Sequence, residues 1–439
     1  MTARRSIVKT TLLLLPLQIV FRAGEALLPL LLAMWFGRTN ATDVYYFAWA
    51  VFALAGALVF SAYQDSALVP ILAEVRMNKP GDVATLVGSL LAHTLVVASA
   101  LAAVIALGAL AWFRVRYEGD DFALSVRMIV PFAGYLVALT LKTFLGAILS
   151  SEHRFFPLPI ASALGMATTI GIIVGARHAM GVVIVPVASL AGEVVAIAVL
   201  AWTAFGLAKI GVRLNFSRPE PARRFARLIA SEVGGSAVTR INPVVDQLMA
   251  VLAMVVGGGT LLRYSGDVAS LPTSILQVTL LPVLLSHLAE DFAARDVAKI
   301  RATVRRAVLA VIAILLAVAA ILYVLRAPLL RFVFLRGEMD AGGVDRMISL
   351  LPYHLVGLAP FGVLLVLARA HVAVQNSRIM LSMGILNAAL NAIFNVVLLK
   401  AIGLEGIALS TSCVQLAIAI VFWFRFEARL GGHIEPVPR

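Results

Sequence analysis

The sequence predicts an all-α membrane protein with about twelve transmembrane helices in two six-helix lobes. Of its 439 residues 61% are hydrophobic and only 13% are charged, and the apolar residues gather in stretches near the roughly 20 residues that span a bilayer. A soluble domain carries roughly 25% charged residues, so this surface must face lipid. Lipid admits only helices or closed barrels, and the sequence lacks the alternating segments of a barrel.

Short polar markers separate the apolar stretches and set the expected helix boundaries. The first stretch continues through Arg22 and Glu25 to Trp35, so we expect a transmembrane helix there rather than a cleaved leader. The expected helices span residues 10–36, 44–72, 85–113, 127–150, 157–176, 179–206, 227–256, 262–288, 303–326, 343–370, 379–399 and 404–426.

The distribution of basic residues predicts the orientation. The loops on the side of the two termini carry about twice as many Lys and Arg as the opposite loops. We therefore expect a multi-pass protein of the bacterial inner membrane with both termini in the cytoplasm. The basic segment Lys209–Arg227 could instead recruit anionic lipid or a partner, but a topology signal is the simpler interpretation.

The chain also repeats itself at about half its length. Arg22 and Arg240 lie 218 residues apart, and Glu74 and Glu290 lie 216 apart, in matching helices. The offsets predict two six-helix lobes, residues 1–206 and 227–439, joined by a basic cytoplasmic linker at 207–226. Such a body can rock about a central cavity.

Three basic residues lie well inside predicted spans, away from the span ends, where a charge costs several kcal/mol and usually faces a cavity or a partner. Arg22, Lys142 and Arg240 predict a cationic cavity for a phosphate or pyrophosphate, because the arginine fork grips phosphate oxygens in pairs. Lys142 needs a partner from another helix, water or an anionic ligand. Arg22 shares a helix face with Glu25, so a self-neutralising pair is the alternative.

Carboxylates in the spans are candidates for ion coupling or for lining the cavity. The sequence holds no Gly-x-x-x-x-Gly-Lys loop for ATP, so protons, sodium or the membrane potential would drive transport. We expect no cofactor, metal site or catalytic constellation, because Cys413 is the only cysteine and the seven histidines lack metal-ligand spacing. The candidate carboxylates are Glu25, Asp65, Glu193, Asp246 and Asp267.

Glycines and prolines predict local features of several helices. Gly171 and Gly175 form a small-xxx-small pair that is typical of close helix packing. Each proline inside an expected helix permits a bend, and ordinary packing is an equally good explanation. These prolines are Pro29, Pro131, Pro243, Pro272, Pro282, Pro352 and Pro360.

Several motifs, in order and spacing, resemble the lipid II flippases of the MurJ/MviN type and their polysaccharide-associated relatives. That family belongs to the multidrug, oligosaccharidyl-lipid and polysaccharide exporter superfamily. The resemblance covers most of the chain. The motifs are Phe36-Gly-Arg-Thr-Asn-Ala-Thr-Asp43, Val69-Pro-Ile-Leu-Ala-Glu74, Phe144-Leu-Gly-Ala-Ile-Leu149 with Arg154-Phe155, Val245-Asp-Gln-Leu-Met-Ala250 with Tyr264 and Leu271-Pro272, and Ala368-Arg-Ala-His371 through Asn376-Ser-Arg378.

The resemblance implies two six-helix lobes that carry a polyprenyl-pyrophosphate-linked saccharide, with cavity arginines on the pyrophosphate. It places the family's first cavity arginine on Arg22 and the family's aspartate between helices 1 and 2 on Asp43, which is a further candidate carboxylate. Other basic positions of the family fall on Leu28, Gly56, Ala57 and Asp267, and Lys142 and Arg240 are basic where the family is neutral. These departures favour a related lipid-linked oligosaccharide, such as a cell-surface polysaccharide unit, over lipid II itself.

Three alternatives remain open. A cation-coupled multidrug antiporter of the same superfamily would need an acidic, aromatic cavity. Composition alone does not distinguish such an antiporter from a flippase. A membrane enzyme would need a folded aqueous domain, and the loops are too short for one. A transport-inactive scaffold that recruits partners is the third. We expect a lipid-linked saccharide and membrane lipids as partners, and no nucleic acid.

Overall fold

The computed structural model describes residues 24, 27–62, 68–152, 154–227, 242–253, 255–294, 296–374, 376 and 378–431. Throughout this part of the chain the regular structure is helical, which confirms the all-α fold class. The chain divides into two compact units between Ala237 and Val238, and the short segment Gly37–Thr39 groups with the second unit. Each unit is described by itself below.

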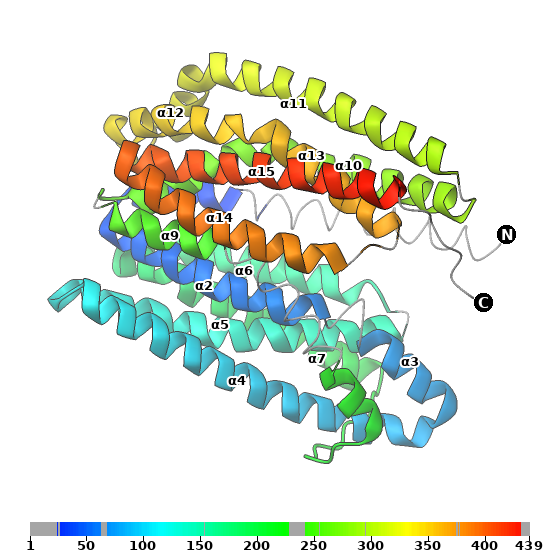
Figure 1. Cartoon of the computed structure of the whole chain (residues 1–439). Helices are drawn as coiled ribbons and strands as arrows, with labels where there is room; N and C mark the ends of the chain where they lie inside the picture. Colours follow the sequence, from blue (N-terminus) through cyan, green and yellow to red (C-terminus); the bar gives the residue numbers. More distant parts are fainter. Residues whose placement is uncertain are drawn as a thin grey trace. The chain divides into compact units, whose positions relative to one another are not determined.

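The first unit contains a group of antiparallel helices joined by short turns (Figure 1). The long helices α4 and α5 pack together, α5 also packs on α2 and α7, and α6 packs on α7. Trp202–Leu207 continues α7 as a π-helix. The helices are α2 (Asn40–Ala62), α3 (Leu68–Asn78), α4 (Val83–Arg116), α5 (Gly119–Ser151), α6 (Pro157–Met180) and α7 (Ile184–Ala201).

The second unit is a bundle in which α13 packs against α10, α11 and α15, and α14 packs against α15 (Figure 1). Its helices are α9 (Asn242–Leu252), α10 (Gly258–Ala293), α11 (Val297–Phe334), α12 (Ala341–Val356), α13 (Leu358–Ala373), α14 (Arg378–Ile402) and α15 (Leu404–Gly431).

Among the described residues, six helical stretches are long and apolar enough to cross a membrane, or seven if a bent pair counts as one span. One of the six, Pro157–Leu207, contains both α6 and α7. Of the expected helix 10–36, the structure describes Gly24 and Leu27–Phe36. Of the expected helix 227–256, it describes chiefly α9.

The expected single helix at 343–370 is two helices, α12 and α13, bent by 41°. Pro360 lies in the first turn of α13, where its missing N–H costs nothing, but its ring prevents the helix from continuing back through residue 356. Gly357 stands at the break because a Cβ there would collide with Ser412 and Gln415. The break thus falls beside Pro360, whereas α5 and α10 continue through Pro131, Pro272 and Pro282.

The glycines that let α6 and α7 approach are not the predicted pair. A Cβ on Gly165 would lie 2.7 Å from the carbonyl oxygen of Gly192, so these two glycines form the close crossing. A Cβ on Gly171 or Gly175 would meet nothing within 4 Å, because both lie on the exposed face of α6. The small-xxx-small pattern was wrong here, since sequence spacing alone does not say which helix face meets a neighbour.

Helix α11 places its charges at the two ends of an apolar run. The run 307–325 lies between Arg306 and Arg326, and Arg326 sits 4.1 Å over the ring of Tyr323. At 1.5 Å per residue this run is roughly 28 Å long, close to the roughly 30 Å thickness of a hydrocarbon core. The helix continues past both charges, to Val297 on one side and to Phe334 on the other.

Part of the expected linker is ordered on the first unit. Residues 220–227 form a short helix, and its buried Ala222 and Phe225 pack in a hydrophobic cluster with Leu68, Ile71 and Leu72. The segment 207–226 is therefore more than a connecting loop.

Candidate functional site

A carboxylate in the second unit is held by three neutral side chains from two neighbouring helices. Asp246 of α9 is half-buried. Its Oδ1 accepts from Nδ2 of Asn395 at 2.8 Å and from Nδ2 of Asn391 at 3.1 Å, and its Oδ2 accepts from Oγ1 of Thr411 at 3.2 Å. We call these four residues the Asp246 cluster.

The hairpin of α14 and α15 brings these partners together. Asn391 and Asn395 are four residues apart on α14, so they share one helix face, and both are fully buried. The turn between the helices uses Gly403 at φ +71°, and Gly406 lies so close to the backbone of Leu398 that a Cβ would not fit. This tight hairpin places Thr411 of α15 beside the two asparagines.

The cluster has the composition of a site for a monovalent cation or a proton. It holds one negative charge, surrounded by amide and hydroxyl groups that carry none, and the buried Oδ1 of Asn395 has no hydrogen-bond partner. Hard cations prefer oxygen ligands, and the oxygens available here are the Asp246 carboxylate, Oγ1 of Thr411 and Oδ1 of Asn395, because the amide nitrogens donate to the carboxylate. Among the described residues, no group of three His, Cys, Asp or Glu side chains is placed to hold a metal ion.

The predicted cavity cation Lys142 pairs with another helix. Its Nζ on α5 lies 2.7 Å from both carboxylate oxygens of Glu193 on α7, and the side chains are only 10% and 14% exposed. The sequence left Lys142 with a partner from another helix, water or an anionic ligand, and the structure shows the partner from another helix. The expectation that Lys142 holds pyrophosphate stays a prediction, since a bound anion would share the lysine with Glu193.

Replacing Lys142 with methionine should destabilise the first unit, because it leaves the buried Glu193 carboxylate without its counter-charge. Breaking one side of such a pair costs about 3–5 kcal/mol, so we expect a clear fall in the unfolding midpoint of the purified protein. The double variant Lys142→Met/Glu193→Met should recover most of the loss.

The exposed pair Arg227–Glu220 is the matched control, because its side chains are 73% and 68% exposed and such pairs contribute roughly 0–1 kcal/mol. A Lys142→Met variant as stable as Arg227→Met would contradict the prediction. If the stable double variant transports normally, Lys142 has no part in substrate binding.

The remaining predicted residues are partly placed. Asp267 on α10 accepts from Nε of Arg263 at 3.0 Å, one turn earlier, so its charge is offset locally. Asp43 is buried on α2. Lys142 and Glu193 meet in the first unit, whereas Asp246 and Asp267 belong to α9 and α10 of the second and have different hydrogen-bond partners. Outside the described residues lie Arg22, Glu25, Asp65 and Arg240.

Two residues of the Phe36-to-Asp43 motif, Gly37 and Arg38, contact the segment before α12 in the second unit. Gly37 has φ +58°, and a Cβ there would overlap the carbonyl of Glu338. Arg38 donates from Nε and from an Nη to the two oxygens of Asp340, at 2.8 and 3.1 Å. Asp340 is the N-cap of α12 and accepts from the backbone N–H of Gly343. The motif thus anchors the segment Gly37–Thr39 to the start of α12.

We expect this anchor to hold at neutral pH and to release only in strong acid. The hydrogen bonds from Arg38 lower the pKa of Asp340 below its usual range. A lowered carboxyl pKa gives stability that is full above the unfolded value, roughly 4, and is lost as pH falls through the folded value. A spin label on Thr39→Cys should stay immobile from pH 7 to 5 and gain mobility below about pH 4.

In the Arg38→Gln background the same label should be mobile at every pH. Release between pH 6 and 5 in the parent protein would show that another group controls the anchor.

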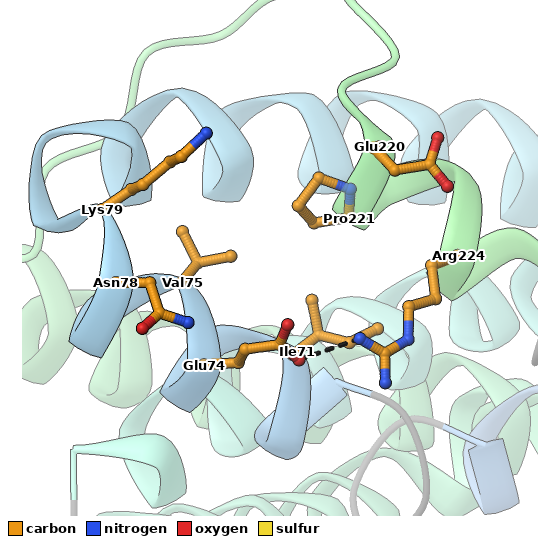
Figure 2. A pocket seen from close by; sticks show the side chains of 8 residues that line it. All are labelled: Ile71, Glu74, Val75, Asn78, Lys79, Glu220, Pro221 and Arg224. Carbon is orange, nitrogen blue, oxygen red and sulfur yellow. Dashed lines mark hydrogen bonds and ion pairs between the residues drawn. The ribbon is translucent and has the colours of Figure 1, made fainter.

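A pocket of about 270 Å³ opens beside α3 in the first unit (Figure 2). Arg224 of the short helix reaches across it and donates to Glu74 at 2.8 Å, so the charges lining the pocket largely pair with one another. It is lined by Ile71, Glu74, Val75, Asn78, Lys79, Glu220, Pro221 and Arg224.

The sequence argument missed Asn391, Asn395, Thr411 and Arg263. Neutral amides and hydroxyls are tolerated in apolar helices, so they give little signal singly. A usable signal was present in two places: two asparagines four residues apart in an apolar stretch, and an arginine four residues before Asp267.

Comparisons with known proteins identify both the fold and the family of this chain. A solved lipid II flippase MurJ in an inward closed conformation has a TM-score of 0.78 at 17% identity and covers 95% of this chain and 87% of its own. An inward-facing multidrug resistance MATE family transporter of the MOP superfamily has a TM-score of 0.74 at 16% identity and covers 94% of both. The fold is therefore that of the membrane transporters to which MurJ and MATE proteins belong.

The sequence comparisons narrow this class. Residues 32–438 match the model of the family described as lipid II flippase MurJ, and the chain belongs to that family. A lipid II flippase MurJ of Burkholderia cenocepacia is 24% identical over 424 residues, which is 93% of this chain and 81% of the relative. A probable lipid II flippase MurJ of Rhizobium tropici is 24% identical over 324 residues, 72% of this chain and 60% of the relative.

These findings confirm the family resemblance drawn from the motifs, and the prediction of about twelve helices in a transporter fold. They make the chain a multi-pass membrane protein whose curated relatives are flippases rather than catalysts. The chain spans only three fifths of the length of the Rhizobium tropici relative.

Proposed function

We propose that this protein moves a polyprenyl-pyrophosphate-linked oligosaccharide across the bacterial inner membrane by alternating access. The match of residues 32–438 to the lipid II flippase family carries the proposal. The cargo is lipid II or a cell-surface polysaccharide unit built on the same kind of carrier. The departures from the family's basic pattern at Leu28, Gly56 and Ala57 favour the polysaccharide unit.

Arginines 22 and 240 are our proposed pyrophosphate ligands, one from each repeat, with Lys142 as a third cation. The Asp246 cluster is our proposed coupling site. Its single charge suits one proton or one sodium ion, whose movement down the membrane potential contributes about 2.3 kcal/mol per 100 mV. No ATP or organic cofactor enters this scheme.

Reconstituted full-length protein tests the function directly. Vesicles loaded with labelled lipid II, or with a labelled polyprenyl-pyrophosphate oligosaccharide, should show translocation when an ion gradient is applied. Vesicles with an organic cation dye test the alternative, a cation-coupled multidrug antiporter, which the likeness to a MATE transporter keeps in view. Uptake of the dye without lipid translocation would reject the flippase proposal, and no transport of either would favour a scaffold.

We also propose that both termini lie in the cytoplasm. Reporters fused after residue 227 and after Arg301 should read as cytoplasmic, and fusions within residues 114–122 as periplasmic, because of the excess of Lys and Arg on the first side. Opposite signals at any two of these sites would overturn the predicted helix count.

A further inference from the structure

Residues 208–219 form a strap without regular secondary structure along the start of α4 in the first unit. The backbone N–H of Arg213 donates to the carbonyl of Ala84, and Nδ2 of Asn215 donates to that of Thr85 at 2.9 Å. Oγ of Ser89 donates to the carbonyl of Ser217. A Cβ on Gly88 would overlap the carbonyl of Arg213, so this glycine allows the strap to lie directly on the helix.

The exposed surface of the strap combines large apolar side chains with cations. Leu214 and Phe216 are 70% and 71% exposed. Lys209 and Arg213 are exposed in the same segment. Soluble surfaces rarely expose such a pair, so this face fits an environment with both acyl chains and negative charge.

The strap lies where α4 enters the apolar layer. The ring of Phe216 packs edge-on to His93, 6.0 Å away, and one turn further along α4 the side chains of Val96 and Val97 are 56% and 61% exposed. With 34 residues, α4 is about 50 Å long and exceeds the roughly 30 Å core. The first ten or so residues of α4, which carry the strap, therefore fall at headgroup level.

The charge of this region is one-sided. Residues 208–227 hold six Lys and Arg and a single acid, Glu220. Arg224 and Arg227 are engaged with Glu74 and Glu220, and the buried side of the short helix is docked through Ala222 and Phe225. Lys209, Arg213 and Arg223 are exposed on the rest of this surface.

We propose that the strap is an interfacial anchor that binds anionic phospholipids of the adjoining leaflet. Leu214 and Phe216 enter the boundary between headgroups and acyl chains, and Lys209 and Arg213 contact the lipid phosphates. In the proposed topology this is the cytoplasmic leaflet. The anchor is independent of what the protein transports.

Depth measurements on the full chain test the apolar half of the proposal. In a Cys413→Ser background, a spin label on Phe216→Cys is compared with one on Asn78→Cys, an exposed polar position on α3. In vesicles with phosphatidylglycerol the label at 216 should be shielded from a water-soluble nickel relaxant and open to oxygen, and in pure phosphatidylcholine it should lie shallower. Equal nickel access at 216 and 78, or equal depth in both vesicles, would overturn the proposal.

Lipid retention tests the charged half. Lys209→Gln/Arg213→Gln should lower the affinity for phosphatidylglycerol, followed by native mass spectrometry, about tenfold, since each cation near an anionic surface adds to binding. The strap keeps its backbone bond to Ala84 in this variant. The control Arg224→Gln/Arg227→Gln removes two cations from the adjoining short helix, where Glu74 and Glu220 already pair with them, and should have little effect. An equal loss in both variants would mean that overall charge, not the strap, holds the lipid.

Discussion

Replacing Asp246 with asparagine should abolish gradient-driven transport while the protein stays folded in the membrane. The substitution keeps the size of the side chain and removes the only charge of the Asp246 cluster. Interactions with a charged group contribute about 1.5–3 kcal/mol each, so a bound cation should lose roughly 100-fold in affinity. Transport should fall at least tenfold and lose its response to the ion gradient.

The neutral partners separate sodium from protons. If sodium binds, it should raise the unfolding temperature of the parent protein, and Asn391→Ala, Asn395→Ala and Asp246→Asn should each reduce that rise. If a proton binds, sodium should have no such effect and transport should follow the pH gradient alone. Asp345→Asn is the matched control, because Asp345 forms a pair with Arg331 that is 58% exposed on both sides. An Asp246→Asn variant that keeps full gradient-driven transport would remove the cluster from the mechanism.

Arg22→Ala and Arg240→Ala should each abolish lipid translocation with normal expression. A pyrophosphate carries enough charge to engage both arginines, and losing one bidentate contact removes two charge-assisted hydrogen bonds. Arg→Lys should rescue each position only in part, because lysine keeps the charge and loses the fork. Arg305→Ala, an exposed arginine of α11, serves as the control for the loss of one positive charge.

The self-neutralising alternative for Arg22 makes the opposite prediction. If Arg22 only offsets Glu25, the double variant Arg22→Ala/Glu25→Ala should transport normally. If Arg22 holds pyrophosphate, that variant should be as inactive as Arg22→Ala. A vesicle translocation assay on the three proteins decides between them.

The fold was predictable because lipid leaves the backbone few choices. Runs of about 20 apolar residues located α4 and α14 closely at both ends, whereas α5 begins at Gly119 rather than 127 and α11 runs from Val297 to Phe334 rather than over 303–326. The break at Gly357 was not predictable in place: several prolines each permitted a bend, and its position depends on the close approach of Ser412, which no local pattern reveals.

The candidate site was harder to predict than the fold, because its residues act in pairs across helices. Lys142 and Glu193 both stood out as charges in apolar stretches, but their pairing requires α5 and α7 to be neighbours. Asp246 stood out alone, and its amide partners were hidden because asparagine is an ordinary residue in a transporter helix. Sequence therefore finds the costly group before it finds the groups that stabilise it.

Helix α11 makes the second unit sensitive to membrane thickness. Its apolar run of roughly 28 Å ends at a charge on each side, and Tyr323 with Arg326 marks one of these ends as interfacial. A thicker bilayer would draw Arg306 or Arg326 toward hydrocarbon, and tilting would only worsen the mismatch. The membrane would then have to thin around this helix, or the arginines would have to reach back to the interface, and both cost free energy. The lipid environment that best supports the protein is therefore one of ordinary thickness, without the lengthening that sterols or long acyl chains impose.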